Sequence, residues 1–371
     1  MNISGVNNCY GCGVCAVVCS RHIIKIKLNK DGFYEPYITD SNKCTDCGLC
    51  MDVCSYSHND LSLRDINIKG YAAWSNEETV RHKCSSGGVS FEIALKLINK
   101  GYKVCGARYN PTNNRVEHYI AETEEDCKQS IGSKYIQSYT VDGFNTINKK
   151  EKYLVIGTPC QIDSFRRYIR RFHCEDNFVL MDFFCHGMPS YNLWEKYLKY
   201  SRINHPENIV WRNKDFGWHD SYNMIIKNTG KTFQCRATEG DLFYKYFFGH
   251  YCLGRQCVDS CRFKMFNSCA DIRIGDFWGK AYQNNEEGVS AVITFTERGD
   301  ELLKQSNCKV VEHPLDVVVD GQMENNACNN RQSVLFCKLL RTYMPLYIID
   351  KIIIVQYYYT RLKDKLFKCA K

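Results

Sequence analysis

The first 62 residues carry an alternating pattern between two cysteine-rich runs. Apolar residues alternate with lysines over residues 24–28, residues 29–32 supply a polar turn with a glycine, and residues 33–38 return with further apolar positions. A period of two is typical of a strand with one buried face, so this stretch predicts a β-hairpin. We expect residues 1–62 to form a small domain.

From about residue 70 the pattern changes, and short apolar runs alternate with longer stretches of helical period. Such alternation is typical of α/β units around a partly parallel sheet. Strands are predicted over residues 71–74, 102–109, 153–156, 178–184, 222–227, 271–274 and 290–295. Helices are predicted over residues 89–100, 161–171 and 193–202. The predicted fold class is α+β, with a small N-terminal domain, a mixed α/β domain over residues 63–340 and a C-terminal helix over residues 341–371.

Composition adds one anomaly to this picture. Hydrophobic residues make up 44% and charged residues 24% of the chain, as in globular proteins. The charge-free apolar run at residues 352–359 is far shorter than the roughly 20 residues that cross a bilayer, and we expect a cytoplasmic protein. Cysteine is abundant, with 23 among 371 residues. In a reducing compartment so many thiols predict bound metal rather than disulfides.

The net charge of +8 gathers toward the C-terminus. Residues 341–371 hold seven Lys or Arg and only two Asp or Glu. A tyrosine-rich apolar segment leads into Arg361, Lys363, Lys365 and Lys368, which favours contact with a partner protein or an anionic membrane surface. A helix packed on its own domain would show the same pattern. The interleaved aromatic and basic stripe of a nucleic-acid-binding surface is missing, so we expect no nucleic acid partner.

Two runs of four cysteines share the spacing C-x2-C-x2-C-x3-C. In this pattern three thiolates bind one iron-sulfur cluster and the fourth binds the other, which predicts two [4Fe-4S] clusters. The ligands predicted for the first cluster are Cys9, Cys12, Cys15 and Cys54. Those predicted for the second are Cys44, Cys47, Cys50 and Cys19. Structural zinc is the alternative, but zinc has no need of duplicated runs. The proline that usually follows the fourth cysteine is replaced by Ser20 and Ser55.

Two short polar runs predict an anion site. Residues 84–88 read Cys-Ser-Ser-Gly-Gly directly before the predicted helix at 89–100. Hydroxyls and glycine amides at a helix N-terminus can bind a phosphate, although a capped helix after a tight turn has the same pattern. Residues 132–135, Gly-Ser-Lys-Tyr, would add a cation and a ring to the same ligand. A solvated loop explains them equally well.

Two cysteines follow predicted neighbouring strands. Residues 153–156 run into Gly-Thr-Pro and Cys160, and residues 178–184 run into Cys185 and His186. Ligands bind at the carboxyl ends of parallel strands, and a helix N-terminus favours a thiolate, so these residues form a candidate site. His186 is a candidate for moving a proton. Separate buried thiols are the simpler alternative.

Four more cysteines lie within 18 residues, ahead of a Gly-Asp-Phe-Trp-Gly run at residues 275–279. They are Cys252, Cys257, Cys261 and Cys269. In a reducing compartment this density suggests another metal site, either zinc or a cluster.

Together, the signatures Ser-Ser-Gly-Gly, Gly-Ser-Lys-Tyr, Gly-Thr-Pro-Cys-Gln, Cys-His-Gly and Gly-Asp-Phe-Trp-Gly resemble the coenzyme F420 hydrogenase/dehydrogenase beta-subunit family, fused to an N-terminal two-cluster ferredoxin domain. The resemblance implies an iron-sulfur oxidoreductase with FAD beside a third [4Fe-4S] cluster. The residues it places near flavin are Ser85, Ser86, Gly87, Gly88, Lys134 and Tyr135. The residues it implies as third-cluster ligands are Cys160, Cys185, Cys257 and Cys261. The family usually has two residues between the last two ligands, whereas three lie between Cys257 and Cys261. Cys252 or Cys269 would then replace one of these two ligands.

The expected reaction follows from these parts. Flavin exchanges a hydride for single electrons, and clusters conduct single electrons. We therefore expect a hydride-carrying small molecule such as coenzyme F420, and a redox partner protein or low-potential electron carrier, with Cys160 and His186 as catalytic candidates. The alternatives are a ferredoxin-like module that has lost flavin and serves in docking, and a zinc-bearing nucleic-acid-binding protein.

Overall fold

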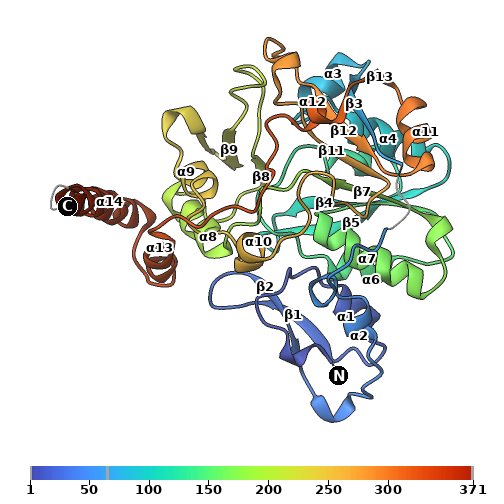
Figure 1. The fold of residues 1–371 in the computed structure, drawn as a ribbon, viewed down its shortest axis with the longest axis horizontal. Coiled ribbons are helices and arrows are strands. Elements are labelled where there is room, and N and C mark those ends of the chain that lie inside the picture. Colours follow the sequence, from blue (N-terminus) through green and yellow to red (C-terminus); the bar gives the residue numbers. More distant parts are fainter. Residues whose placement is uncertain (1, 64–66, 369–371) are drawn as a thin grey trace.

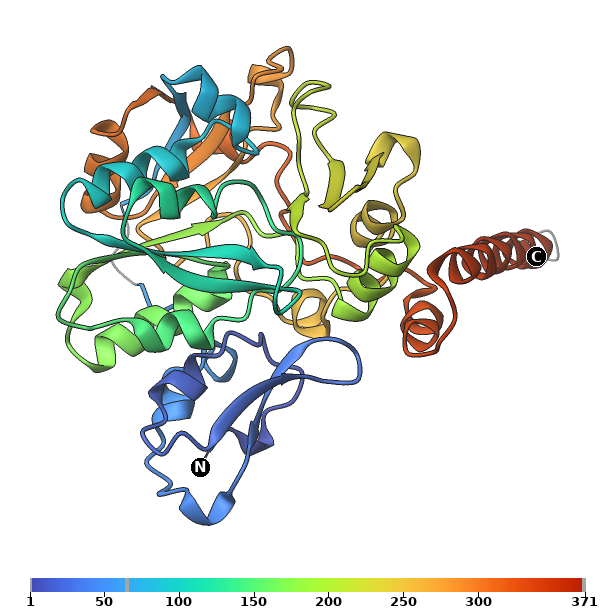
Figure 2. The ribbon, with the colours of Figure 1, turned by 180° about the vertical axis from the view of Figure 1, so that it is seen from behind.

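The computed structural model describes residues 2–63 and 67–368, with side chains placed as far as residue 361. The N-terminal lobe contains two short helices, α1 (Val14–Val18) and α2 (Leu49–Asp52), and the predicted hairpin. Strand β1 (Ile24–Leu28) pairs antiparallel with β2 (Tyr34–Ile38), which confirms the hairpin. The lobe lies beneath the larger part of the molecule in Figure 1 and in the reverse view of Figure 2.

An eight-stranded mixed sheet forms the centre of the large domain, in the order β13-β3-β12-β11-β7-β6-β4-β5. Its strands are β3 (Lys69–Ser75), β4 (Lys103–Asn110), β5 (Arg115–Ala121), β6 (Tyr153–Ile156), β7 (Phe178–Phe183), β11 (Ile272–Asp276), β12 (Ser290–Thr294) and β13 (Cys308–Glu312). Strands β4, β6, β7 and β11 run parallel, and the strands on either side of them are antiparallel. The predicted partly parallel sheet is therefore confirmed.

Helices cover both faces of this sheet because its central strands are apolar on both sides. Leu154 of β6 packs into a cluster with α4 (Val89–Ile98) and α11 (Glu297–Lys304). The neighbouring Val155 belongs to the opposite cluster, which includes Phe165 of α7 (Pro159–Arg171). Further helices are α3 (Glu78–Lys83), α5 (Glu124–Lys128), α6 (Val141–Thr146) and α12 (Leu315–Val319).

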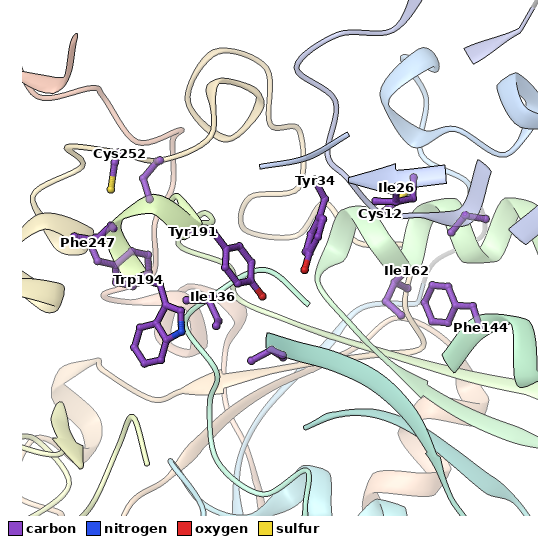
Figure 3. Packing of buried hydrophobic residues seen from close by; sticks show 14 of the residues in the cluster. Cys12, Ile26, Tyr34, Ile136, Phe144, Ile162, Tyr191, Trp194, Phe247 and Cys252 are labelled. Atoms are coloured by element: carbon purple, nitrogen blue, oxygen red, sulfur yellow. The ribbon is translucent and has the colours of Figure 1, made fainter. Parts of the chain in front are cut away.

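The N-terminal lobe packs on the α7 side of the sheet. One hydrophobic cluster runs from Ile26 of the hairpin to Trp194 of α8 (Tyr191–Tyr200) without a break. Within it, the rings of Tyr34 and Tyr191 lie near each other in Figure 3. They pack edge to face with their centroids 5.5 Å apart. Gln137 adds a polar clamp, since its amide donates to the Tyr10 carbonyl at 2.9 Å. Because the core crosses residue 62, the division at that residue remains a proposal.

A second, smaller sheet and four further helices belong to the large domain and the C-terminal segment. A three-stranded sheet comprises β8 (Asn208–Val210), β9 (Asn223–Asn228) and β10 (Lys231–Arg236), and α9 (Leu242–Phe248) and α10 (Arg255–Asp259) follow it. Helix α13 (Ser333–Leu340) precedes α14 (Leu346–Lys368), which projects from the body in Figure 1. No helix in the part of the chain that the structure describes has the length and apolarity needed to cross a membrane.

Helix α14 is buried only at its start. Leu346, Ile349 and Ile353 are buried, whereas Val355 and Tyr359 are 68% and 61% exposed. Arg361 is exposed as well. The side chains of Lys363, Lys365 and Lys368 lie outside the described residues, so the predicted basic end of this helix stays a prediction.

A buried ion pair joins the two parallel strands at the centre of the sheet. Arg273 of β11 donates two hydrogen bonds to the Asp182 carboxylate of β7, both at 2.7 Å, and both side chains are fully buried. The same guanidinium donates to the Met265 carbonyl at 2.7 Å. Arg273 thereby fixes the loop that follows Cys261 to the sheet.

We predict that Arg273→Ala lowers the free energy of unfolding by about 3–5 kcal/mol, because it leaves the Asp182 carboxylate buried without its partner. The control is Lys128→Ala, which breaks an exposed ion pair with Glu125 and should cost no more than about 1 kcal/mol. Urea unfolding measures both. Equal, small losses would show that the buried pair contributes no more than a surface contact.

Candidate functional site

The structure brings the first predicted set of N-terminal thiols together. Gly13, with φ of 76°, starts α1 in the left-handed conformation and turns the chain around the thiols. Cys9, Cys12, Cys15 and Cys54 are all buried. Burial, followed by the nearby thiols of Cys12, Cys9 and Cys54, holds the pKa of Cys15 well above its usual range. Burial and Cys54 raise the pKa of Cys12 to about 11.

The second set lies nearer the surface. Burial raises the pKa of Cys50, and the neighbouring thiols of Cys47 and Cys19 raise it further. Cys47 is exposed. Cys44 precedes α2 and accepts a hydrogen bond from the Asn2 amide at 3.4 Å. This set therefore reaches solvent, whereas the first set is enclosed by protein.

A third group of thiols converges at the carboxyl edge of the large sheet. Cys160 lies in the first turn of α7, directly after β6, and Cys185 follows the adjacent parallel strand β7. Burial raises the pKa of Cys160, and the thiols of Cys185, Cys257 and Cys12 raise it further. Cys261 adds to the raised pKa of both Cys185 and Cys257. The four thiols that the family resemblance names are thus neighbours.

The other two cysteines of residues 252–269 lie elsewhere, so the structure does not support one metal site made from all four. Cys252 is buried, and its raised pKa reflects burial and then Cys337. The Cys269 thiol donates to Asp163 at 3.0 Å and accepts from the Ser62 amide at 3.2 Å. Neither therefore replaces Cys257 or Cys261, because packing and hydrogen bonding occupy both.

Four thiols in each group match the donor set of a [4Fe-4S] cluster. Among the residues that the structure describes, no three His, Cys, Asp or Glu side chains are placed to hold one metal ion, as a tetrahedral zinc site requires. In a [4Fe-4S] cluster each thiolate binds a different iron, so the four thiols stand further apart. The donor sets fit clusters.

A cavity of about 380 Å³ lies at the same sheet edge. The predicted flavin-binding residues that line it are Ser85, Ser86, Gly88, Lys134 and Tyr135, and Cys185 and His186 line it too. The two signature loops are tied together there, because the Ser133 amide donates to the Ser85 hydroxyl at 2.8 Å. Cys160 and Gly87 are not among the lining residues, which separates Cys160 from a direct catalytic contact.

Gly87 has a structural role that the sequence did not indicate. Its amide donates to the Ser290 hydroxyl at 3.0 Å, so this amide is already used and is not free for an anion. A Cβ at this position would lie 2.4 Å from the Ala73 carbonyl oxygen. Glycine is required here because the turn passes directly against β3.

Lys134 is turned toward its own loop. Its ammonium group donates to the carbonyls of Ser130, Ile131 and Gly132 at 2.7, 3.0 and 3.0 Å. Desolvation lowers the pKa of Lys134 to about 7. This lysine therefore shapes the loop at the cavity wall, and its three N–H donors are already used by that loop.

His186 connects the cavity with a second histidine. The two Nε2 atoms of His186 and His250 are 3.0 Å apart, so one imidazole donates and the other accepts. Burial, followed by His250 and Lys264, lowers the pKa of His186 to about 4. His186 is therefore neutral at neutral pH, and the pair can pass a proton between the cavity and the partly exposed His250.

His118 of β5 is a cavity residue that sequence reasoning missed. Its Nε2 lies 2.9 Å from the Ile156 carbonyl, which only accepts, so Nε2 carries the proton. Desolvation lowers the pKa of His118 to about 4. The bare Nδ1 is buried, with no partner among the described residues. It is enclosed by protein, and the histidine acts at the cavity wall by holding the Ile156 carbonyl.

Aromatic rings complete the cavity wall. Tyr135, Tyr222, Phe247, Phe248 and Trp278 line it. Asp276 holds Arg212 with a 2.5 Å hydrogen bond, and the Arg212 guanidinium lies 4.7 Å from the Tyr222 ring centroid. The Gly-Ser-Lys-Tyr and Gly-Asp-Phe-Trp-Gly runs were the sequence signals for this wall, through Tyr135 and Trp278.

Comparison with known proteins matches both parts of the chain. Residues 150–315 match the family model for the C terminus of the beta subunit of coenzyme F420 hydrogenase/dehydrogenase, and residues 8–57 match the 4Fe-4S dicluster domain. The resemblance seen in the sequence is therefore confirmed. A solved structure, the xenon-derivatised F420-reducing [NiFe] hydrogenase complex from Methanosarcina barkeri, aligns over 76% of this chain and 90% of that chain, with 17% identity and a TM-score of 0.47. No curated protein matches significantly.

We predict that Cys160→Ala removes about four of the irons bound per chain, because one cluster loses a ligand. Cys252→Ala, a change of the same size at a buried thiol outside the three sets, should leave the iron content unchanged. Iron and acid-labile sulfide analysis of anaerobically purified variants measures the difference. Iron loss in Cys252→Ala but not in Cys160→Ala would reassign the ligands.

Proposed function

We propose that this chain, a member of the coenzyme F420 hydrogenase/dehydrogenase beta-subunit family with a 4Fe-4S dicluster domain at its N-terminus, is a flavin-dependent iron-sulfur oxidoreductase. It passes electrons between a hydride carrier, such as coenzyme F420, and a one-electron partner. The observation that carries the proposal is the position of Cys185, which lines the cavity and neighbours the thiols of Cys257 and Cys261. Cys185 thus belongs both to the cavity wall and to the third group of thiols.

The cavity suits a small molecule in size and the flavin ring of FAD in chemistry. Its volume of about 380 Å³ falls within the roughly 300–1,000 Å³ of small-molecule sites. The ring wall suits a flat aromatic group. Bound flavin would supply the exchange of a hydride for two single electrons. The neutral His186 would give or take the accompanying proton through His250.

The thiol sets fit clusters because burial opposes bare thiolates. The pKa of Cys12 is raised to about 11 and that of Cys257 to about 12, chiefly by desolvation. Such thiols become anionic only when a cation neutralises them, which the iron of a cluster does. The large-domain set is next to the enclosed N-terminal set, because Cys12 is among the groups that raise the pKa of Cys160.

The one-electron partner would approach the second N-terminal set. Cys47 is exposed there, so electrons have a short exit to a protein or a small carrier. The exposed tyrosines of α14 offer a further contact surface for a partner protein or an anionic membrane surface. We expect no nucleic acid partner.

We predict that anaerobically purified protein contains about 12 irons, about 12 acid-labile sulfides and one FAD per chain, because three sets of four thiols each hold one cluster. Metal, sulfide and flavin analysis on one sample measures all three quantities. Iron without flavin would indicate an electron-transfer or docking module instead. Zinc without iron would contradict the whole proposal.

We predict that His118→Phe weakens FAD binding about tenfold, since it removes a hydrogen bond worth about 1.4 kcal/mol that holds the Ile156 carbonyl at the cavity wall, while keeping a ring against Phe144. The control is the same change at His205, which is exposed and outside the cavity. Flavin titration of the apoprotein measures the dissociation constant, and thermal melting checks folding. Unchanged affinity in a folded His118→Phe variant would remove this residue from the flavin site.

A further inference from the structure

Ser55 stands where the two-cluster cysteine pattern usually has proline. It follows Cys54, the fourth cysteine of the second run, and it is fully buried. Ser20 occupies the equivalent position after Cys19 and is exposed. Both halves of the repeat have serine in place of proline, but only Ser55 is buried. The contacts of Ser55 inside the protein must therefore explain why serine stands at this position.

Ser55 forms two hydrogen bonds that proline cannot form. Its amide donates to the Ser164 hydroxyl at 3.0 Å, and its own hydroxyl donates to the Cys160 carbonyl at 3.2 Å. Proline has neither an N–H nor a hydroxyl. Both bonds cross from the N-terminal lobe to α7, and each ends beside a thiol of the candidate site.

Ser164 completes the bridge on the other side. Its hydroxyl oxygen lies 3.2 Å from the Cys12 sulfur. Because this oxygen accepts from the Ser55 amide, its own proton is free to be donated to Cys12 once that sulfur is a thiolate. Residues four apart share a face of a helix, so α7 presents Cys160 to one thiol set and Ser164 to the other.

Neighbouring contacts hold the same joint. The Ser62 amide donates to Asp163 at 2.9 Å, and Arg167 donates to the Asp60 carbonyl at 2.6 Å. These contacts dock the lobe on α7, but they do not reach a sulfur of the thiol sets. Among these contacts, only those of Ser55 and Ser164 connect predicted cluster ligands of the N-terminal lobe with a predicted cluster ligand of the large domain.

We propose that Ser55 and Ser164 are positioning residues that hold the cluster of Cys9, Cys12, Cys15 and Cys54 against the cluster of Cys160, and so set the coupling for electron transfer between them. The step moves one electron from the reduced cluster to the oxidised one, and no bond or proton changes place. This inference rests on the proposed function, since it needs a cluster at each set.

The matched test compares Ser55→Pro with Ser20→Pro. The residues before both positions are extended, with ψ of 107° at Cys54 and 101° at Cys19, so either backbone accepts a following proline. Ser164→Ala removes the Ser55 amide bond and the Cys12 contact from the large-domain side. It keeps the bond from the Ser55 hydroxyl to the Cys160 carbonyl and changes no residue of the N-terminal lobe. Iron content is measured first, in the wild-type protein and in all three variants.

Two readouts follow on the reduced, iron-loaded proteins. The first is the magnetic interaction between clusters in the electron paramagnetic resonance spectrum, and the second is the single-turnover rate at which reducing equivalents cross from one set to the other. We expect Ser55→Pro and Ser164→Ala to weaken the interaction and to slow transfer at least about tenfold, because small displacements cost large factors in rate. Ser20→Pro should match the wild type.

Different results would overturn the proposed bridge and the proposed function. Wild-type protein without iron at one set would overturn the proposed function itself. Loaded Ser164→Ala that matches Ser20→Pro in both spectrum and rate would overturn the bridge alone. If Ser55→Pro loses iron, Ser164→Ala decides, because it leaves every cysteine and the N-terminal backbone unchanged.

Discussion

Helix α7 is the element on which the rest of the arrangement depends. It begins at the carboxyl end of β6 with Pro159, whose fixed φ and missing N–H suit a first helical turn. Its buried face packs on the sheet through Phe165. The first turn holds Cys160 and the next holds Ser164, which touches the N-terminal lobe. Without this helix, the cavity and the two thiol sets would have no common support.

Burial determines the protonation of the thiols and histidines around the cavity. Desolvation raises the pKa values of Cys15, Cys160 and Cys257, and it lowers those of His118 and His186. Both shifts favour neutral side chains. A site of this kind attracts groups that bring their own compensating charge, such as cluster iron, and flat ligands that meet uncharged donors and acceptors. Thiols and cavity are therefore suited to a redox centre.

Local patterns predicted much of this architecture. The spacing of the first eight cysteines indicated the interleaving that places Cys54 beside Cys12, and the apolar runs before Cys160 and Cys185 indicated adjacent parallel strands. Strand β5 escaped prediction because Glu117 is buried in a cluster of arginines, which hides the strand pattern. His118 and Gly87 escaped too, because their parts depend on Ile156 and Ala73, which are distant in sequence. The meaning of Ser55 was visible only once the lobe was docked.

The central claim is that one thiol set lies between the cavity and the N-terminal lobe and holds a cluster. Anomalous scattering from iron in crystals of anaerobically purified protein tests it most directly. We expect three separate iron positions, with the middle one enclosed by Cys160, Cys185, Cys257 and Cys261. Iron at the N-terminal positions alone, with the four large-domain thiols unliganded, would contradict it.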